Sequence, residues 1–187
     1  LIRSHSVGVG EPLAAPIIRL MLATKAASLA RGYSGVREIV IDTLVAVHNA
    51  GLVPDVPSQG SVGASGDLAP LAHMTLALLG EGYIWVNGIK RPALDALKDA
   101  GISPLTLEAK EGLALINGTQ TSTALALHAL FIFAPVFEAC LVIGALTIDA
   151  ARGSDGPFDA RIHELRGQRG QIEVATVYRN LLIGSEI

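Results

Sequence analysis

The sequence predicts a mainly helical fold with one small β-hairpin. Apolar residues recur at helical spacing in several separate stretches, and glycines stand where these stretches end, as is typical of helix C-caps. One short segment, residues 83–89, has Asn87 and Gly88 between apolar residues, which favours a hairpin with a two-residue turn. Half of the 187 residues are hydrophobic, which is ample for a buried core.

The N-terminal part is expected to begin with two helices. Residues 16–30 are mostly apolar, and Gly32 follows at the position of a C-terminal cap. Ser34 can then cap a second helix, in which apolar residues recur until Gly51 (Val36, Ile39, Val40, Leu44 and Val47). A tight turn therefore joins the two predicted helices.

A loop and a third helix follow. Residues 52–63 contain Pro54, Pro57 and several glycines and serines, which favours a loop. Asp67 is the expected N-cap of a helix that ends near Gly80.

Beyond the hairpin, the sequence predicts a short helix over residues 93–100, a helical stretch over 107–116 and a break at Asn117 and Gly118. Thr119 or Thr121 can cap a long helix that lasts to about Ala151. Residues 152–171 are polar and rich in glycine, and a last helical stretch follows them.

The most apolar part of the long helix, residues 123–148, is interrupted by His128, Pro135 and Glu138. Ionisable residues are costly within a membrane, so we interpret this stretch as a helix buried inside a bundle rather than a membrane span. No repeat, low-complexity tract or linker divides residues 1–187, which are expected to form a single segment.

Composition excludes several partners. The chain has 14 Lys and Arg against 17 Asp and Glu, a net charge of -3, so it has no electrostatic footprint for nucleic acid or an anionic membrane. Cys140 is the single cysteine, which excludes an internal disulfide and suits a reducing compartment. We therefore expect a cytoplasmic protein in which Cys140 is a buried, inert thiol.

The ends of the chain predict a segment of a longer protein. Leu1 is not a methionine, and the first ten residues have neither the apolar core nor the cleavage pattern of a signal peptide. The last residues, RNLLIGSEI, stop in an apolar, helix-like stretch without a terminating signal.

Several familiar sites are excluded by spacing. GASGD lacks the glycine two residues after the serine that a nucleophile elbow needs, and no Lys-Ser/Thr pair makes the loop a phosphate-binding one. The five histidines have no paired metal spacing. We interpret His48, His73 and His128 as hydrogen-bonded structural imidazoles. The nearby arginines 161, 166 and 169 fit a solvated or subunit-facing loop.

The triplet Ala64-Ser65-Gly66 offers an uncommon chemistry. The Gly66 amide nitrogen can attack the carbonyl carbon of Ala64 and close a five-membered ring, because a glycine nitrogen is unhindered and glycine tolerates a strained backbone. Loss of water from the ring and of the Ser65 hydroxyl would leave a methylene conjugated to an imidazolone, which is an electrophile. The alternative interpretation is a glycine-rich turn that leads into a helix.

Three stretches, in order, resemble the aromatic amino-acid ammonia-lyase family. They are GSVGASGDLAPLAHM (residues 60–74), KEGLALINGTQ (110–120) and FDARIHELRGQRGQ (158–171). The resemblance covers essentially the whole chain and is strongest to bacterial histidine-specific members. It implies a bundle of long parallel and antiparallel helices, of the aspartase/fumarase-like lyase type.

The resemblance also implies the site residues. Ala64, Ser65 and Gly66 would form a 4-methylidene-imidazol-5-one group, with no metal or nucleotide. Asn117 would hydrogen-bond the ring oxygen or the substrate's amino-acid group, and His5 would contact the substrate side chain. Ser4 and His5 together resemble the pair of histidine-specific members, and an imidazole substrate needs such a polar partner.

The implied reaction removes ammonia from L-histidine to give trans-urocanate. Either the substrate amine or the substrate ring would attack the methylene, and a base would take the β-proton. The alternatives are a tyrosine or phenylalanine ammonia-lyase or 2,3-aminomutase, and a non-catalytic helical scaffold that lacks the ring. The family's full proteins are longer homotetramers with shared sites, and its catalytic tyrosine and downstream substrate-binding residues lie outside this chain.

Overall fold

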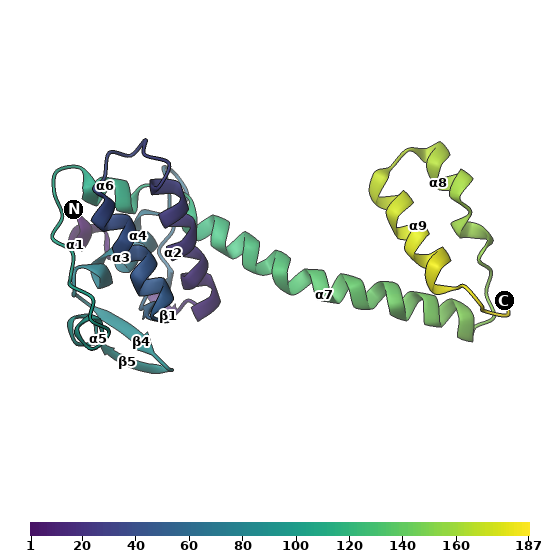
Figure 1. The fold of residues 1–187 in the computed structure, drawn as a ribbon, viewed down its shortest axis with the longest axis horizontal. Helices are drawn as coiled ribbons and strands as arrows, with labels where there is room; N and C mark the ends of the chain where they lie inside the picture. The colour runs from purple at the N-terminus through teal and green to yellow at the C-terminus, as the bar shows by residue number, and fades with distance from the viewer. The chain divides into compact units, whose positions relative to one another are not determined.

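The computed structural model describes all 187 residues and divides them into two compact units, Leu1–Ala129 and Leu130–Ile187 (Figure 1). The boundary falls inside one continuous helix, α7 (Gln120–Ala150), so no linker separates the units. The predicted mainly helical fold with a small sheet is confirmed.

The first unit holds six short or medium helices and five short strands before α7 begins. In chain order they are α1 (Ile2–His5), β1 (Val9–Pro12), α2 (Ala15–Leu29), α3 (Glu38–Asn49), β2 (Val53–Pro54), β3 (Pro57–Gln59), α4 (Leu68–Leu78), β4 (Tyr83–Val86), β5 (Ile89–Pro92), α5 (Ala93–Asp99) and α6 (Glu111–Ile116).

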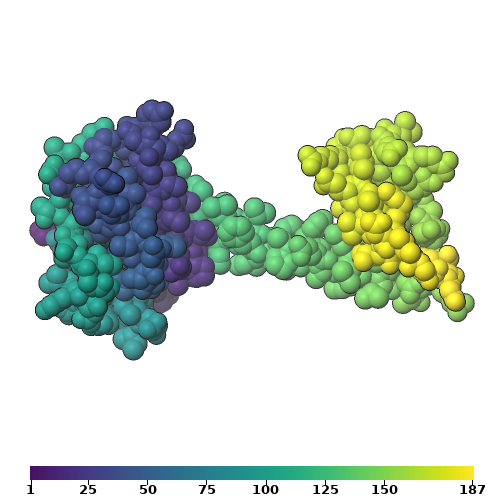
Figure 2. Space-filling model, viewed as in Figure 1, coloured from purple at the N-terminus to yellow at the C-terminus, as the bar shows by residue number.

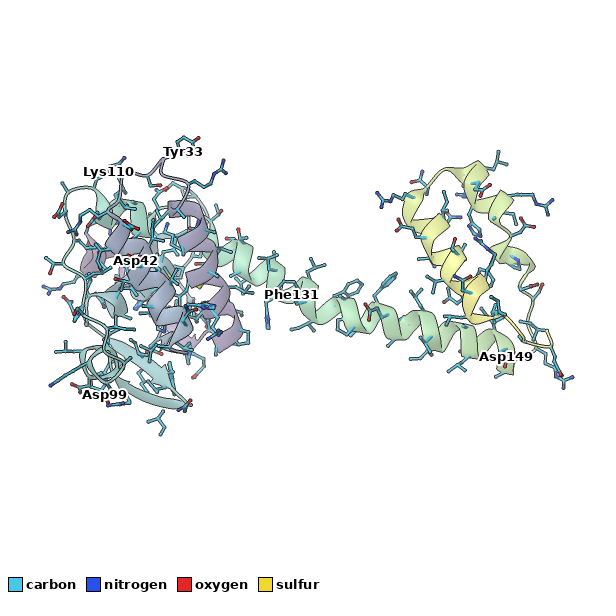
Figure 3. All side chains as sticks on the ribbon, in the orientation of Figure 1. Tyr33, Asp42, Asp99, Lys110, Phe131 and Asp149 are labelled. Atoms are coloured by element: carbon cyan, nitrogen blue, oxygen red, sulfur yellow. The ribbon has the colours of Figure 1, made fainter.

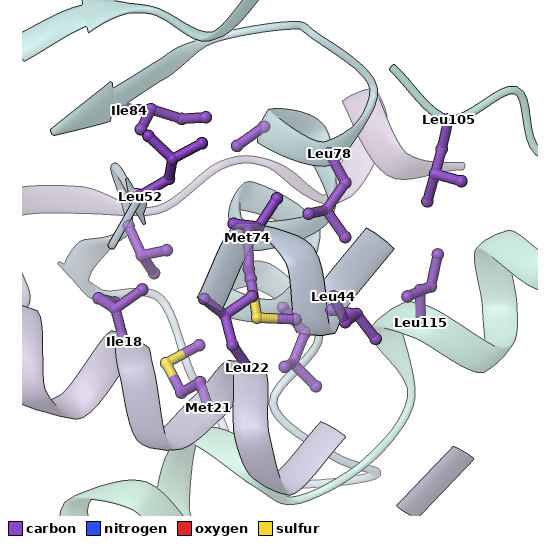
Figure 4. Packing of buried hydrophobic residues seen from close by; sticks show 14 of the residues in the cluster. Ile18, Met21, Leu22, Leu44, Leu52, Met74, Leu78, Ile84, Leu105 and Leu115 are labelled. Carbon is purple, nitrogen blue, oxygen red and sulfur yellow. The ribbon is translucent and has the colours of Figure 1, made fainter. Parts of the chain in front are cut away.

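The core of this unit lies where α2, α3, α4 and α6 meet, with Leu52 and Ile84 added at the side of the small sheet (Figure 4). Helix α2 contributes residues spaced three or four apart, which places them on one face. These helices bury the apolar faces that their spacing predicts, and α4 is buried along almost its whole length.

The hairpin forms as predicted, with Val86 opposite Ile89 and the turn at Asn87 and Gly88. Both turn residues have positive φ, 49° and 81°, which is the geometry of a type I′ turn. Strand β2 extends this sheet in the order β2-β4-β5. Residues 52–63, predicted as a loop, therefore contain two very short strands.

The other pairing, β1 with β3, places the segment after α1 beside the segment that leads into the glycine-rich loop. Val9 lies opposite Gln59 and Pro12 opposite Pro57, with an irregular register between the two pairs. Gly8 and Gly60 come so close that a Cβ on Gly60 would lie 3.1 Å from the Gly8 Cα.

Some predicted helix ends are wrong. Ser34 is not a cap, because α3 begins at Glu38 after Arg37. The helix predicted over residues 107–116 forms only from Glu111 onward. Neither Thr119 nor Thr121 caps α7 through its side chain, and the Thr121 hydroxyl is buried without a hydrogen-bond partner.

Helix α7 differs from its predicted burial within these 187 residues. Its apolar residues from Leu130 to Ile143 are largely exposed, and Figure 2 shows this green stretch with uncovered side chains. Phe131 projects from the helix in Figure 3 and is 58% exposed. Cys140 is also exposed, so the prediction of a buried thiol is wrong for this chain. By length and composition alone, the helical stretch Glu111–Ala150 could cross a membrane.

The second unit contains the rest of α7, a short 3₁₀ turn η1 (Gly156–Phe158) and the helices α8 (Ala160–Arg166) and α9 (Arg169–Leu181). Helix α8 lies within residues 152–171, the polar and glycine-rich stretch for which the sequence predicts no helix. Asp159 caps it by accepting a hydrogen bond from the Arg161 amide at 2.9 Å. The ring of Phe158 stacks on Tyr178 of α9, with centroids 4.8 Å apart.

Candidate active site

The triplet Ala64-Ser65-Gly66 lies in the loop between β3 and α4. Ala64 and Ser65 are exposed, whereas Gly66 is half-buried and Asp67 is fully buried. Helix α4 begins at Leu68, directly after this loop. The loop is thus accessible at its tip and fixed where it enters the helix.

Gly66 is pressed against the break between α6 and α7. Its φ is +118°, and a Cβ at this position would lie 2.9 Å from both the nitrogen and the oxygen of Gly118. Only glycine combines this backbone conformation with such a close approach. The Gly66 backbone is therefore set by the chain that lies across it.

Asn117 and Gly118 hold the backbone on both sides of Gly66. The Asn117 side-chain amide donates to the Ser65 carbonyl at 3.3 Å, and the Asp67 amide donates to the Gly118 carbonyl at 2.7 Å. The structure therefore brings Asn117 to the triplet, as the sequence predicts.

Asp67 occupies the predicted N-cap position of α4, but its side chain bonds elsewhere. Its carboxylate does not cap α4; it accepts hydrogen bonds from the Ser61 hydroxyl at 2.6 Å and from the Ser122 amide and hydroxyl, both at 2.8 Å. The Ser122 amide is one of the unpaired donors at the start of α7, so Asp67 caps that helix instead. Burial alone would raise the pKa of Asp67, but the hydrogen bonds from Ser61 and Ser122 outweigh it and lower that pKa.

Lys25 reaches the same corner from α2. Its side chain is 1% exposed, and its Nζ donates to the Asn117 carbonyl at 3.0 Å and to Gln120 Oε1 at 3.3 Å. Burial lowers the pKa of Lys25 to about 8. No carboxylate pairs with it, which is uncommon for a buried lysine.

Ser4 and His5 lie in α1, and neither hydrogen-bonds with the triplet. The Ser4 hydroxyl and the His5 Nδ1 both hydrogen-bond with the Leu1 carbonyl, at 2.8 and 2.9 Å, and they lie 3.1 Å from each other. The chain then passes through β1 alongside β3. The two predicted substrate-contacting residues are thus neighbours of each other, on a segment that is tied to the entrance of the loop.

The predicted structural histidines differ among themselves. His73 accepts a hydrogen bond from the Gly8 amide through Nε2 at 3.1 Å, and burial lowers its pKa, so it is a neutral acceptor here. His48 has only a long contact of 3.4 Å to Asn49, and His128 has no hydrogen bond. The hydrogen-bonded interpretation is clear for His73 alone.

The arginines predicted to lie in a loop, 161, 166 and 169, lie instead on the helices α8 and α9. Arg161 pairs with Asp159 at 2.6 Å and Arg169 with Glu173 at 2.8 Å, and both arginines are highly exposed. His163, which lies between these arginines along the chain, is buried. It hydrogen-bonds with the Pro157 carbonyl and with the Gln171 side chain. This stretch stabilises its own local fold.

Sequence reasoning missed Lys25 and the partners of the Asp67 carboxylate, although it placed Asp67 correctly at the N-cap position of α4. A signal for Lys25 was present, because it lies three or four residues from Met21, Leu22 and Leu29 and so on the apolar face of its helix. No local pattern links Asp67 to Ser122, since 55 residues separate them.

These features define a helical protein with a tightly held, glycine-rich Ala-Ser-Gly loop at the start of two helices. The chain belongs to the aromatic amino acid lyase family, whose model matches residues 1–187. It is 60% identical to a histidine ammonia-lyase of Burkholderia pseudomallei over its whole length, and it spans 37% of the length of that protein.

Solved structures share the fold. The histidine ammonia-lyase of Trypanosoma cruzi matches 96% of the chain with a TM-score of 0.89 and 41% identity, over 35% of its own length. The tyrosine aminomutase of Streptomyces globisporus matches 98% with a TM-score of 0.91 and 40% identity, again over 35% of its length. The fold is therefore common to enzymes with different names and does not by itself select a substrate.

Proposed function

We propose that the full-length protein containing this chain is an ammonia-lyase that converts L-histidine to trans-urocanate. The observation that carries the proposal is the loop itself, in which Asn117 and Gly118 hold the backbone on both sides of Gly66 and leave Ser65 exposed. The 60% identity to a histidine ammonia-lyase supports the choice of reaction.

The residues present fit a 4-methylidene-imidazol-5-one group formed from Ala64, Ser65 and Gly66. The Gly66 amide is the nitrogen that ring closure needs, and the space beside Gly66 admits no Cβ. Ser65 is exposed, so its β-carbon is open to a small molecule. Such a group would supply an electrophilic methylene, which no ordinary side chain provides.

The surrounding residues are suited to stabilise negative charge at the loop. The Asn117 side-chain amide donates to the Ser65 carbonyl, and the N-termini of α4 and α7 both lie beside the loop. Backbone amides at helix N-termini carry partial positive charge, which favours a developing anion nearby. The Asp67 carboxylate offsets part of the positive charge at the start of α7, since it accepts a hydrogen bond from the Ser122 amide.

Histidine is favoured as the substrate by His5 and Ser4, which offer polar partners to an imidazole. A phenyl side chain would leave these groups unpaired, which costs binding energy. Tyrosine is the second candidate, because its hydroxyl can also use a polar contact and because a tyrosine aminomutase matches the fold with 40% identity.

We also propose that the full-length protein is a cytoplasmic homotetramer with shared sites. Two observations support the assembly: the apolar side chains along α7 are exposed in this chain, and the chain spans only 37% of a relative's length. Residues contributed by the rest of the protein or by other subunits would complete the site.

The test is product analysis of the full-length protein with histidine, tyrosine and phenylalanine separately. We expect urocanate and ammonia from histidine and at least about a tenfold lower kcat/KM for the other two, because a polar site rejects a ring that leaves it unpaired. A β-amino acid from tyrosine would instead indicate the aminomutase. A Ser65→Ala variant is the matched control, and its full activity would contradict the proposal.

A further inference from the structure

The buried lysine of α2 is hard to explain by stability alone. Lys25 is 1% exposed, and the two groups that accept its hydrogen bonds are neutral oxygens. A buried ammonium without a carboxylate destabilises a fold, because burial removes its hydration and no opposite charge replaces it.

The ends of two helices meet at this ammonium. Gln120, one of its two partners, is the first residue of α7, whose positive end disfavours a cation. The Asn117 carbonyl, the other partner, is the C-cap of the short helix α6, whose negative end favours a cation. The two dipoles thus oppose each other, and neither replaces a carboxylate. A methyl or thioether group would fill this place in the apolar core at a lower cost.

The contacts of Lys25 converge on the backbone that shapes the loop. It holds the carbonyl of Asn117, whose side chain donates to Ser65, and it holds the side chain of Gln120. That side chain in turn lies against Gly118, since a Cβ on Gly118 would overlap the Gln120 amide. Lys25 thus contacts the groups on either side of Gly118, the residue pressed against Gly66.

We propose that Lys25 is a positioning residue, which fixes the Asn117–Gly118 backbone so that Asn117 is aimed at the Ala64-Ser65-Gly66 loop. The inference rests on the proposed function, because it assigns Lys25 a part in the activity of that loop. Lys25 acts through Asn117 and Gly118 and does not itself touch the triplet.

The test compares Lys25→Met with Arg19→Met in the full-length protein. Arg19 is the matched control because it lies on the same helix and also donates to a backbone carbonyl, that of His48 at 3.2 Å, away from the loop. Lys25→Gln, which keeps a neutral donor of shorter reach, is measured beside them so that the result does not depend on one variant folding.

Three quantities are measured: the melting temperature, the fraction of peptide Gly60–Met74 that has lost two waters, and kcat and KM for histidine. For Lys25→Met we expect an unchanged or higher melting temperature, a smaller dehydrated fraction and a kcat at least about tenfold lower per dehydrated site, since small displacements of positioned groups are costly. KM should change much less, and Arg19→Met should keep wild-type kcat.

A Lys25 variant that folds with a wild-type dehydrated fraction and wild-type kcat would overturn the assignment. So would a loss of melting temperature in both Lys25 variants with normal kcat in the folded fraction, because that is the result of a purely structural role. If the wild-type protein itself shows neither dehydration nor turnover, the proposed function fails; that result is distinct from failure of Lys25 alone.

Discussion

Gly63 and Gly66 share a positive φ but differ in their surroundings, which separates backbone strain from close packing. Gly63 has φ +67° and open space around its missing Cβ, whereas a Cβ on Gly66 would lie 2.9 Å from the Gly118 backbone. The same substitution at the two positions therefore has different consequences.

We predict that Gly66→Ala destabilises the chain by more than about 3 kcal/mol and prevents dehydration of the loop, because strain and a clash with backbone atoms add together. Gly63→Ala should cost only about 1 kcal/mol, since only the left-handed conformation is penalised. Denaturant unfolding and peptide mass measure both effects. Equal costs at the two positions would show that Gly118 does not constrain the loop.

The lowered pKa of Lys25 predicts that the stability of the chain depends on pH. Burial lowers its pKa to about 8 from 10.5, so the unfolded chain binds the proton more tightly than the folded chain. The contribution of Lys25 to the free energy of unfolding therefore rises with pH between these two values, by roughly 3 kcal/mol in total.

This change is measured as the difference in unfolding free energy between wild type and Lys25→Met from pH 7 to pH 10.5. The unfolding free energy of the wild type should increase relative to that of the variant as pH rises. A difference that stays flat over this interval would mean that the ammonium is solvated or paired.

At the scale of elements, one ion pair joins the start of α3 to α6. The Arg37 guanidinium donates to both carboxylate oxygens of Glu111, at 2.9 and 2.8 Å, and the Glu111 side chain is 2% exposed. The Glu108 amide also donates to it at 2.8 Å. The hydrogen bonds from Arg37 are the main reason that the pKa of Glu111 falls to about 2.

We predict that Glu111→Gln lowers the unfolding free energy by about 2 kcal/mol, because the donors of Arg37 and Glu108 lose a charged, buried acceptor. Asp99→Asn breaks the exposed Arg91–Asp99 pair and should cost less than about 0.5 kcal/mol. The stabilisation from Glu111 is complete above its ordinary pKa of 4.5 and is lost as pH falls toward 2. Acid unfolding at the same midpoint for wild type and Glu111→Gln would contradict this.

The elements that the sequence predicts well are those whose signals are local. Asn87 and Gly88 have the torsions that a two-residue turn requires, so the hairpin could be placed to the residue. The apolar spacing of α2 likewise predicts its buried face. Side-chain caps of helices were harder to predict. The Asp67 carboxylate accepts a hydrogen bond from the Ser122 amide, which is close in space but 55 residues away along the chain.

The same holds for the candidate site: residues marked by short motifs could be predicted, and contacts between distant segments could not. The Ala64-Ser65-Gly66 triplet and Asn117 lie together as expected, since short motifs mark both. Ser4 and His5 lie together, but their approach to the triplet is not a contact in this chain. Lys25 was missed because its role arises only when α2 packs against the break before α7.

For the whole molecule, the exposed apolar surface of α7 is the most consequential feature. Phe131, Ile132 and Phe133 are each 58% exposed, and a continuous apolar patch of this kind is typical of a surface that contacts a partner, another part of the protein or a membrane.

The isolated 187-residue chain should therefore self-associate as its concentration rises. Replacing Ile132 and Phe133 by Glu should reduce this association, whereas Leu94→Glu, at an exposed leucine on the separate helix α5, should not. Sedimentation velocity over a range of concentrations measures the effect. A chain that stays monomeric throughout would show that the α7 surface needs no partner.

The central claim is that the Ala64-Ser65-Gly66 loop becomes an electrophile, and the mass of peptide Gly60–Met74 from the full-length protein tests it most directly. The protein is purified without reductants or added nucleophiles, which could react with the loop. We predict a mass lower by two water molecules than the sequence gives. An unmodified mass in folded, full-length protein would contradict the account.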